Sequence, residues 1–176
     1  MARAFIALGS NIAPADNVRN ALRLLSEHAR IAAISTVYRT RPIARPEQDD
    51  YYNCVIEIET DTPPQDLRGR VLRTIEDRLG RTRSEDKSAA RTIDLDLILY
   101  DDLVLDTADL RLPDPEIASR PFLAIPLSEL APHLALPGSA IRVSEAADSL
   151  PRGDMTPLAW YTEQLRRDIA HGHSES

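Results

Sequence analysis

This chain is poor in cysteine and in long apolar runs, and each shortage excludes a class of protein. Its 176 residues include a single cysteine, Cys54, which rules out an internal disulfide framework and fits a reducing compartment. No apolar stretch approaches the length of a membrane-spanning helix. The first apolar run, residues 4–8, is too short for the core of a signal peptide. We therefore expect a cytoplasmic protein that makes no membrane contact.

Positive charge is outnumbered by negative charge, with 21 Lys and Arg residues against 28 Asp and Glu residues. The net charge is −7 at pH 7, so the chain lacks the basic face with which proteins usually bind nucleic acids or membrane surfaces. The sequence contains neither the G-x-x-x-x-G-K-[ST] motif nor the motif set of protein kinases. Its four histidines do not have the spacing of a zinc site. Any bound nucleotide must therefore be held by other residues.

The order of the apolar segments predicts an α+β fold. It is typical of ferredoxin-like proteins, in which an antiparallel sheet with β-α-β-β-α-β order carries its helices on one face. The length suits one main domain, to which we assign residues 1–143. Strands are expected over residues 4–8, 31–40, 51–60 and 91–100, and helices over residues 16–28 and 63–80.

The pattern is weaker after the fourth expected strand. A small hairpin is expected around residues 107–109, and prolines should divide residues 116–130 into short helical pieces. Residues 144–176 are assigned to a C-terminal extension. It should contain one further helix over residues 156–170 and a frayed tail from residue 171.

The strongest single signal is a strand with acids on one face and apolar side chains on the other. Side chains alternate across a strand, so Asp94 and Asp96 should project from the same face. Two carboxylates this close raise each other's pKa unless a cation lies between them, and oxygen ligands suit magnesium. The alternative is a solvated strand face. The side chains expected to bury together on the other face are Ile93, Leu95, Leu97 and Leu99.

A basic loop precedes this strand. Arginine side chains match phosphate oxygens in bidentate fashion, so the loop is typical of a phosphate clamp. A solvated loop balanced by Glu85 and Asp86 is the alternative. Glu76, on the preceding helix, can orient an arginine or accept a nucleotide hydroxyl, or it can be an ordinary solvent-facing acid. The clamp would consist of Arg81, Arg83, Lys87 and Arg91.

Another segment pairs an aromatic ring with a carboxamide. Tyr51 and Asn53 are two residues apart on an expected strand and therefore share a face. A ring can stack on a flat heterocycle while an amide bonds to its edge. Cross-strand aromatic packing is the alternative. Residues 120–122 offer another cation, Arg120, and another ring, Phe122, although Phe122 can equally belong to the core.

Several short segments, taken in order, form the pattern of a known family. They are Gly9-Ser10-Asn11, Tyr38-Arg39-Thr40, Asp50-Tyr51-Tyr52-Asn53, Arg91-Thr92-Ile93-Asp94-Leu95-Asp96-Leu97, Leu112-Pro113 and residues 126–132. Over residues 3–143 the chain resembles the 6-hydroxymethyl-7,8-dihydropterin pyrophosphokinase family of folate biosynthesis. The resemblance implies transfer of pyrophosphate from ATP to the pterin hydroxymethyl group, with release of AMP. Metals and arginines suffice for such a transfer, because it depends mainly on positioning and charge neutralisation.

The resemblance also implies roles for individual residues. Asp94 and Asp96 would hold two magnesium ions, while Arg81 and Arg91 would act in catalysis. ATP would contact Glu76, Arg81, Arg83, Lys87, Arg91, Ile98, Arg111, Asp114 and Arg120. The pterin would contact Thr40, Arg41, Pro42, Ile43, Tyr51, Asn53 and Phe122, with Tyr51 and Phe122 on its two faces. We expect a monomer or a weak homodimer.

The chain departs from the family pattern in three places. Asp114 stands where the family has a histidine, and a carboxylate at that place would repel a triphosphate. Residues 87–91 lack the family's aromatic residue and proline, and Arg41 replaces a smaller neutral residue. These changes predict a weaker affinity for ATP than is usual. Two alternatives stay open: a diverged paralogue acting on another hydroxylated heterocycle, and a binding module without turnover.

Overall fold

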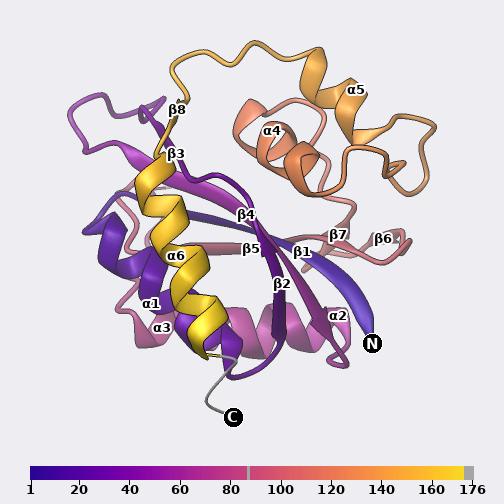
Figure 1. Ribbon diagram of the computed structural model, residues 1–176, viewed down its shortest axis with the longest axis horizontal. Coiled ribbons are helices and arrows are strands. Elements are labelled where there is room, and N and C mark those ends of the chain that lie inside the picture. Colours follow the sequence, from indigo (N-terminus) through magenta and orange to yellow (C-terminus); the bar gives the residue numbers. More distant parts are fainter. Residues whose placement is uncertain (87, 173–176) are drawn as a thin grey trace.

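The computed structural model describes residues 1–86 and 88–172 (Figure 1). Within these ranges six strands form one antiparallel sheet in the order β5-β1-β4-β3-β8, with β2 also paired to β4, while β6 and β7 form a separate hairpin. The predicted α+β class and antiparallel sheet are confirmed. The elements are β1 Ala2–Ser10, α1 Pro14–Ser26, β2 Arg30–Ile34, β3 Tyr38–Thr40, β4 Tyr51–Thr60, α2 Pro64–Asp66, η1 Leu67–Leu72, α3 Arg73–Arg78, β5 Asp94–Tyr100, β6 Leu105–Asp106, β7 Arg111–Leu112, α4 Pro121–Leu130, α5 Val143–Asp148, β8 Thr156–Pro157 and α6 Ala159–Gly172.

One face of the sheet packs against three helical segments: α1, the continuous helix formed by α2, η1 and α3, and α6 (Figure 1). Period-two alternation in the strands supplies the apolar side chains of this face. The helices contribute Leu22, Ile75 and Leu165, each almost fully buried. The strands of the large sheet contribute Ala4, Ile6, Leu8, Ile31, Ile34, Cys54, Ile56, Ile58, Leu95 and Leu97 to this first core.

The opposite face is also partly covered, so the prediction of helices on one face only is wrong. Phe5, Val55 and Leu99 form a second apolar cluster with side chains from α4 and α5. The strands are therefore apolar on both faces over part of their length, and the second face needs its own cover. This cover leaves the ends of β4 and β5 near residues 51 and 94 less buried, and the site lies there.

β5 does not keep strict alternation. Its pairing with β1 shifts between Phe5 and Ile6, so that Leu99 lies opposite Phe5 whereas Leu97 lies opposite Ile6. An extra residue in one strand of a pair turns the following side chain to the other face. The prediction that Leu99 buries with the other three apolar residues is therefore wrong, and Leu99 belongs to the second core. The first core contains Ile93, Leu95 and Leu97, as predicted.

Several predicted segments differ in their bounds. The segment 31–40 forms two strands, β2 and β3, rather than one. Residues 121–130 form one helix, although prolines were expected to break it. Pro126 removes one helical hydrogen bond, but burial of Leu123 and Leu127 against the sheet compensates for the loss. The hairpin around residues 107–109 is confirmed by the pairing of β6 with β7.

The C-terminal extension lies against the sheet and α1 (Figure 1). β8 pairs with β3, and the expected further helix is present as α6, with Tyr161, Thr162 and Leu165 buried. The expected frayed tail is helical at residues 171–172, and residues 173–176 lie outside the described residues. The domain boundary at residue 143 stays a prediction.

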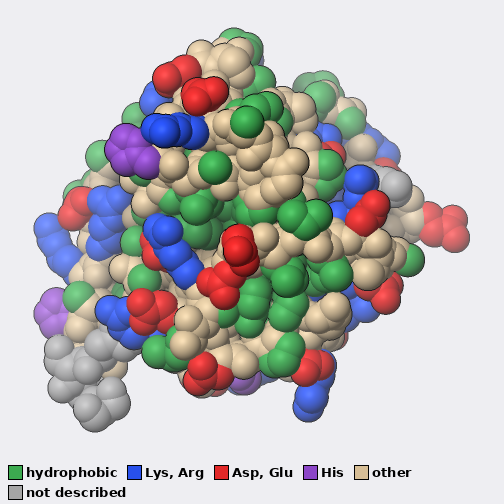
Figure 2. Space-filling model, turned by 90° about the vertical axis from the view of Figure 1, so that its right-hand side faces the viewer, with side chains coloured by type: hydrophobic (Ala, Val, Ile, Leu, Met, Phe, Trp, Pro, Cys, Tyr) green, Lys and Arg blue, Asp and Glu red, His purple; other side chains and the backbone are tan. Residues whose placement is uncertain are grey.

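The surface on the side of the β6–β7 hairpin is shown in Figure 2. Hydrophobic side chains lie across the middle of this face, with acidic side chains among them and further charged side chains toward the rim (Figure 2). Leu103 and Val104, in the turn before β6, are among the exposed hydrophobic residues. Scattered exposure of this kind is common in globular proteins. None of the helices in residues 1–86 and 88–172 is both long enough and apolar enough to cross a membrane.

Candidate active site

Tyr51 and Asn53 of β4 and Asp94 and Asp96 of β5 lie on either side of the intervening strand β1. Gly9 of β1 lies opposite Asn53 of β4 on one side and opposite Asp94 of β5 on the other. Residues directly opposite each other in a sheet share a face, so these side chains project together on the face that α4 covers further along. A Cβ atom at Gly9 would lie 3.0 Å from the Oδ1 atom of Asn53. The glycine therefore leaves open the space between the amide and the carboxylate.

An ion-pair network holds the basic residues against this face. Nη1 of Arg81 pairs with Glu76 and lies 2.8 Å from Oδ1 of Asp94. Nη1 of Arg91 lies 2.7 Å from the other carboxylate oxygen of Asp94. Arg83 pairs with Glu76 at 3.1 Å. Both oxygens of the Asp94 carboxylate thus contact an arginine.

Glu76 is the buried centre of this network. Its side chain is 8% exposed, and Oε2 accepts a hydrogen bond from the backbone N–H of Leu95 at 3.2 Å. Burial raises the pKa of Glu76, while Arg81 opposes that shift. Burial alone would lower the pKa of Arg81, but Asp94 and Glu76 raise it above its usual value. The interpretation of Glu76 as a solvent-facing acid is wrong, because its carboxylate orients two arginines.

Asp96 has different surroundings from Asp94. Its side chain is exposed to solvent, and no hydrogen-bond partner for its carboxylate occurs in the part of the chain that the structure describes. Burial of its base raises the pKa of Asp96 to about 7, the charges of Asp94, Asp114 and Glu76 add to this shift, and Arg81 opposes it. A carboxylate with several acidic neighbours favours a bound cation.

The donor set fits magnesium held partly by phosphate. Within residues 1–86 and 88–172 no three His, Cys, Asp or Glu side chains converge as a metal site. Magnesium characteristically takes only one or two protein carboxylates and completes its shell with water and phosphate oxygens. Asp96 is available for this role, whereas Asp94 would have to exchange an arginine contact for the metal. The acid pair therefore fits magnesium that arrives with a polyphosphate.

The ring and amide expected to bind a heterocycle lie beside the charged network. Nδ2 of Asn53 donates to Oγ1 of Thr40 at 2.7 Å, and Thr40 lies opposite Tyr51 in the sheet. Burial raises the pKa of Tyr51, whose hydroxyl also lies within electrostatic range of Arg91, Asp94 and Arg81. The amide, the ring and the acid–arginine cluster therefore form one continuous site.

The remaining predicted residues lie around this centre. Phe122 packs against the second core and under Arg120, 5.6 Å from its guanidinium carbon, and in the described residues no ring contact joins it to Tyr51. Arg120 pairs with Glu116 at 3.0 Å, and Asp114 lies close enough to raise the pKa of Asp96. Of the other predicted site residues, Arg111 on β7, Arg41 and Ile43 are exposed, Pro42 is half-buried and Ile98 is fully buried. Lys87 lies outside the described residues.

Asn11 has a role that the sequence reasoning missed. It is 2% exposed, its Oδ1 atom accepts the backbone N–H of Arg91 at 2.7 Å, and its Nδ2 atom donates to Gln48 at 3.0 Å. Gln48 in turn donates to the backbone carbonyl of Ser88 at 2.8 Å. Asn11 therefore ties the start of the acidic strand to the loops over residues 41–50 and 81–90. Its place in the Gly9-Ser10-Asn11 segment was the available signal.

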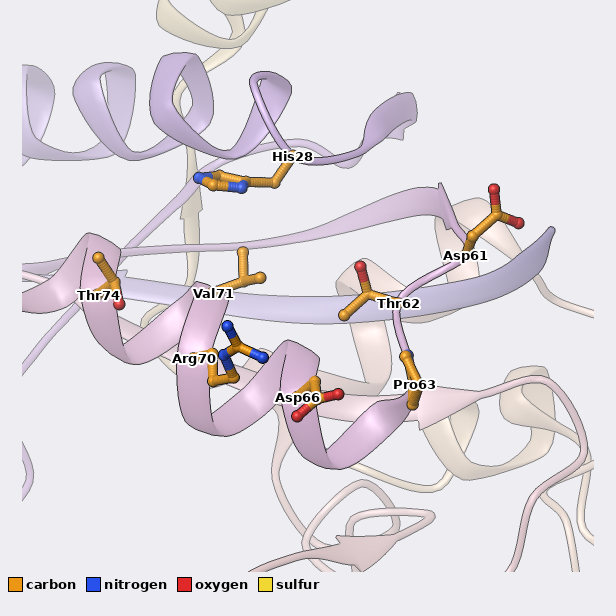
Figure 3. A pocket seen from close by; sticks show the side chains of 8 residues that line it. All are labelled: His28, Asp61, Thr62, Pro63, Asp66, Arg70, Val71 and Thr74. Carbon is orange, nitrogen blue, oxygen red and sulfur yellow. The ribbon is translucent and has the colours of Figure 1, made fainter.

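A separate depression lies elsewhere on the molecule (Figure 3). It has a volume of about 530 Å³ and is lined by the end of α1, the turn after β4 and the helix over residues 64–78. Figure 3 shows the side chains of His28, Arg70 and Asp66 around it. None of the predicted site residues lines it. The acid pair and the ring-binding residues therefore form an open site on the sheet, separate from this depression.

An open sheet face that combines paired acids, arginines and a ring beside an amide has the groups needed to bind a phosphorylated nucleotide and a flat heterocycle. Residues 5–132 match the family described as 7,8-dihydro-6-hydroxymethylpterin-pyrophosphokinase (HPPK). The chain belongs to this family.

Individual relatives agree with this assignment. The chain is 35% identical over 144 residues to a 2-amino-4-hydroxy-6-hydroxymethyldihydropteridine pyrophosphokinase of Haemophilus influenzae, covering 80% of this chain and 89% of that one. It is 33% identical over 150 residues to the folic acid synthesis protein FOL1 of Dictyostelium discoideum, covering 85% of this chain but only 22% of that protein. A crystal structure of wild-type HPPK-DHPS of Plasmodium falciparum with pteroate matches with a TM-score of 0.67 at 13% identity, covering 84% of this chain and 42% of that one. At that identity the structural match supports the fold alone.

Proposed function

We propose that this chain catalyses the reaction of its family, the Mg²⁺-dependent transfer of pyrophosphate from ATP to the hydroxymethyl group of 6-hydroxymethyl-7,8-dihydropterin in folate biosynthesis. The pterin hydroxyl oxygen forms a bond to the β-phosphorus of ATP, and the bond from that phosphorus to the oxygen bridging the α- and β-phosphates breaks. AMP leaves with the bridging oxygen, and the hydroxyl proton is released to solvent. The observation that carries this proposal is the row of Asn53, Gly9 and Asp94 across three strands, with two arginines on Asp94.

The acids and arginines stabilise charge in this proposal. Asp94 and Asp96 would hold two magnesium ions, which would supply neutralisation of phosphate charge and Lewis-acid activation of the transferred group. Arg81 and Arg91, which contact Asp94 in the structure, move to phosphate oxygens when ATP binds. Glu76 keeps Arg81 oriented during this exchange. Phosphoryl-type transfer needs no covalent nucleophile from the protein.

The remaining assigned residues complete the two substrate sites. Tyr51 and Phe122 lie on the two faces of the pterin ring. Asn53 and the backbone of residues 40–43 bind the polar edge of the pterin. A site that hydrogen-bonds such an edge rejects analogues that lack it. ATP contacts are assigned to Arg83, Lys87, Ile98, Arg111, Asp114 and Arg120.

The experiment is an assay of AMP release from ATP and the hydroxymethyl pterin. We expect turnover by the wild-type protein and a loss of about two to four orders of magnitude in kcat for Asp96→Ala, because the acid acts in the transition state. Asp102→Ala is the matched control, since Asp102 is an exposed acid in the turn after the same strand. Nucleotide binding without AMP release would contradict this function and favour a diverged paralogue.

Other properties accompany this proposal. The protein acts as a monomer or a weak homodimer in the cytoplasm. Residues 1–143 form the catalytic domain, of the ferredoxin-like type, and the remaining residues form an extension. Gel filtration with light scattering tests the oligomeric state.

A further inference from the structure

The outer edge of residues 34–41 is covered by the C-terminal segment. β8 pairs with β3, which would otherwise form the edge of the sheet. The backbone N–H of Leu158 donates to the carbonyl of Val37 at 2.8 Å, and the N–H of Val37 donates to Oγ1 of Thr162 at 2.9 Å. The Arg166 guanidinium donates to the carbonyl of Ile34 at 2.9 and 3.1 Å. Because unpaired edge groups are costly, these bonds fix the position of this segment.

One carboxylate of the C-terminal segment reaches beyond the end of β3. Oδ2 of Asp154 accepts the backbone N–H of Arg41 at 2.9 Å and lies 3.8 Å from Nε of the same residue. The Arg41 side chain is 83% exposed, so the ion pair contributes little. The bond from the backbone amide to a charged acceptor is the stronger contact. Asp154 therefore sets the direction in which the chain leaves the sheet after Thr40.

This exit point borders the residues assigned to the pterin. Oγ1 of Thr40 accepts the hydrogen bond from Nδ2 of Asn53 at 2.7 Å, and Thr40 lies opposite Tyr51. A shift of the backbone at Arg41 moves Thr40, and a shift of Thr40 changes the orientation of the Asn53 amide. The contacts thus form a continuous path from Asp154 to the group that binds the pterin edge.

Resting on the proposed function, we propose that Asp154 is a positioning residue for the pterin. It does not touch the substrate, and it acts through the backbone of Arg41 and through Thr40. Its loss therefore weakens pterin binding specifically. ATP binding is unaffected, because the arginines and acids of that site are anchored by Glu76 and Asn11 instead.

The test compares Asp154→Ala and Asp154→Asn in the full chain by steady-state kinetics with each substrate varied. For Asp154→Ala we expect the KM for the pterin to rise about tenfold, because Thr40 and the Asn53 amide are then held less firmly in the orientation that binds the pterin. The KM for ATP and kcat should stay within about twofold, because the contacts of the ATP site are unchanged. In Asp154→Asn the amide oxygen keeps an acceptor for the Arg41 N–H, so the pterin KM should return to within about threefold of the wild-type value. Asp148→Ala is the matched control, since Asp148 is an exposed acid on α5 with no hydrogen bond to residues 34–43 in the described chain.

The outcomes separate this inference from the function on which it rests. A wild-type protein that releases no AMP overturns both. An active wild type with an unchanged pterin KM in Asp154→Ala overturns the inference alone. Equal increases of both KM values, in a variant with a lowered melting temperature, also overturn it, since a general loss of structure would then explain the effect. If Asp154→Ala does not fold, Asp154→Glu is measured in its place. A rise in the pterin KM that exceeds the rise in the ATP KM supports the inference, and equal changes in the two KM values overturn it.

Discussion

Replacement of Glu76 by glutamine tests whether a buried acid organises the arginines. Glu76 is 8% exposed and contacts Arg81, Arg83 and the backbone N–H of Leu95. Breaking a buried ion pair by removing one partner costs about 3–5 kcal/mol. Here Arg81 keeps Asp94, Arg83 keeps its pair with Asp77, and the amide oxygen of glutamine still accepts from Leu95. We therefore expect the free energy of unfolding to fall by about 1–2 kcal/mol.

The same substitution should reduce activity, because Arg81 loses one of the two groups that orient it. We expect kcat/KM for ATP to fall about tenfold, with the KM for the pterin little changed. Urea denaturation followed by circular dichroism measures the stability, and the AMP-release assay measures the activity.

Asp77→Asn is the control for this prediction. Asp77 follows Glu76 on the same helix and pairs with Arg83, but its side chain is 58% exposed. A surface pair of this kind contributes about 0–1 kcal/mol, so stability and activity should stay close to those of the wild type. If Glu76→Gln and Asp77→Asn behaved alike in both measurements, Glu76 would not organise the site, and the reasoning from its burial would be refuted.

Three further substitutions test separate features. Gly9→Ala places a Cβ atom 3.0 Å from Oδ1 of Asn53, so the amide must shift. Steady-state kinetics should show an increase of about fivefold in the pterin KM. An unchanged pterin KM would contradict the assigned role of the amide. Asp114→His removes a carboxylate that lies close to Asp96. Titration calorimetry should show about fivefold tighter binding of ATP with magnesium, because one repulsive charge is lost. Equal or weaker binding would count against repulsion of ATP by Asp114. Leu165→Ala removes a side chain that is 1% exposed in the first core, so urea denaturation should show a loss of about 2–4 kcal/mol, and a loss below about 1 kcal/mol would mean that α6 packs only loosely.

Local sequence patterns were sufficient to predict the main strands and the face that carries the site. Alternation alone placed Asp94 and Asp96 on one face and paired Tyr51 with Asn53, and the register of β1, β4 and β5 brings these faces together. The α+β class follows from the same alternation combined with the helical spacing of the segments between the strands. These features depend on residues within about ten positions of one another, and the sequence displays such relations directly.

The features that the sequence did not predict depend on partners far along the chain. Leu99 changes face because of its pairing with β1, and nothing within β5 indicates the shift. Asn11 joins Arg91, 80 positions away, and Asp154 joins Arg41 across 113 positions. The helix that covers the second sheet face could be predicted only with the knowledge that Pro126 is tolerated inside α4. Each of these contacts results from tertiary packing that overrides the local pattern.

The pairing of Gly9 with Asn53 on one side and with Asp94 on the other has a consequence for the size of the substrate. The Cα atoms of Asn53 and Asp94 are separated by two inter-strand spacings, about 10 Å in a regular sheet. Backbone hydrogen bonds of the sheet fix this separation of the backbone, and the rotamers of the two side chains then set the distance between the amide and the carboxylate. Under the proposed function, a compound whose hydroxyl lies one ring closer to the edge bound by Asn53, or one ring further away, would not reach the reacting phosphate. The strand spacing thus limits the length of a compound that can contact both side chains. Substitutions in the surrounding loops can alter affinity without altering that spacing.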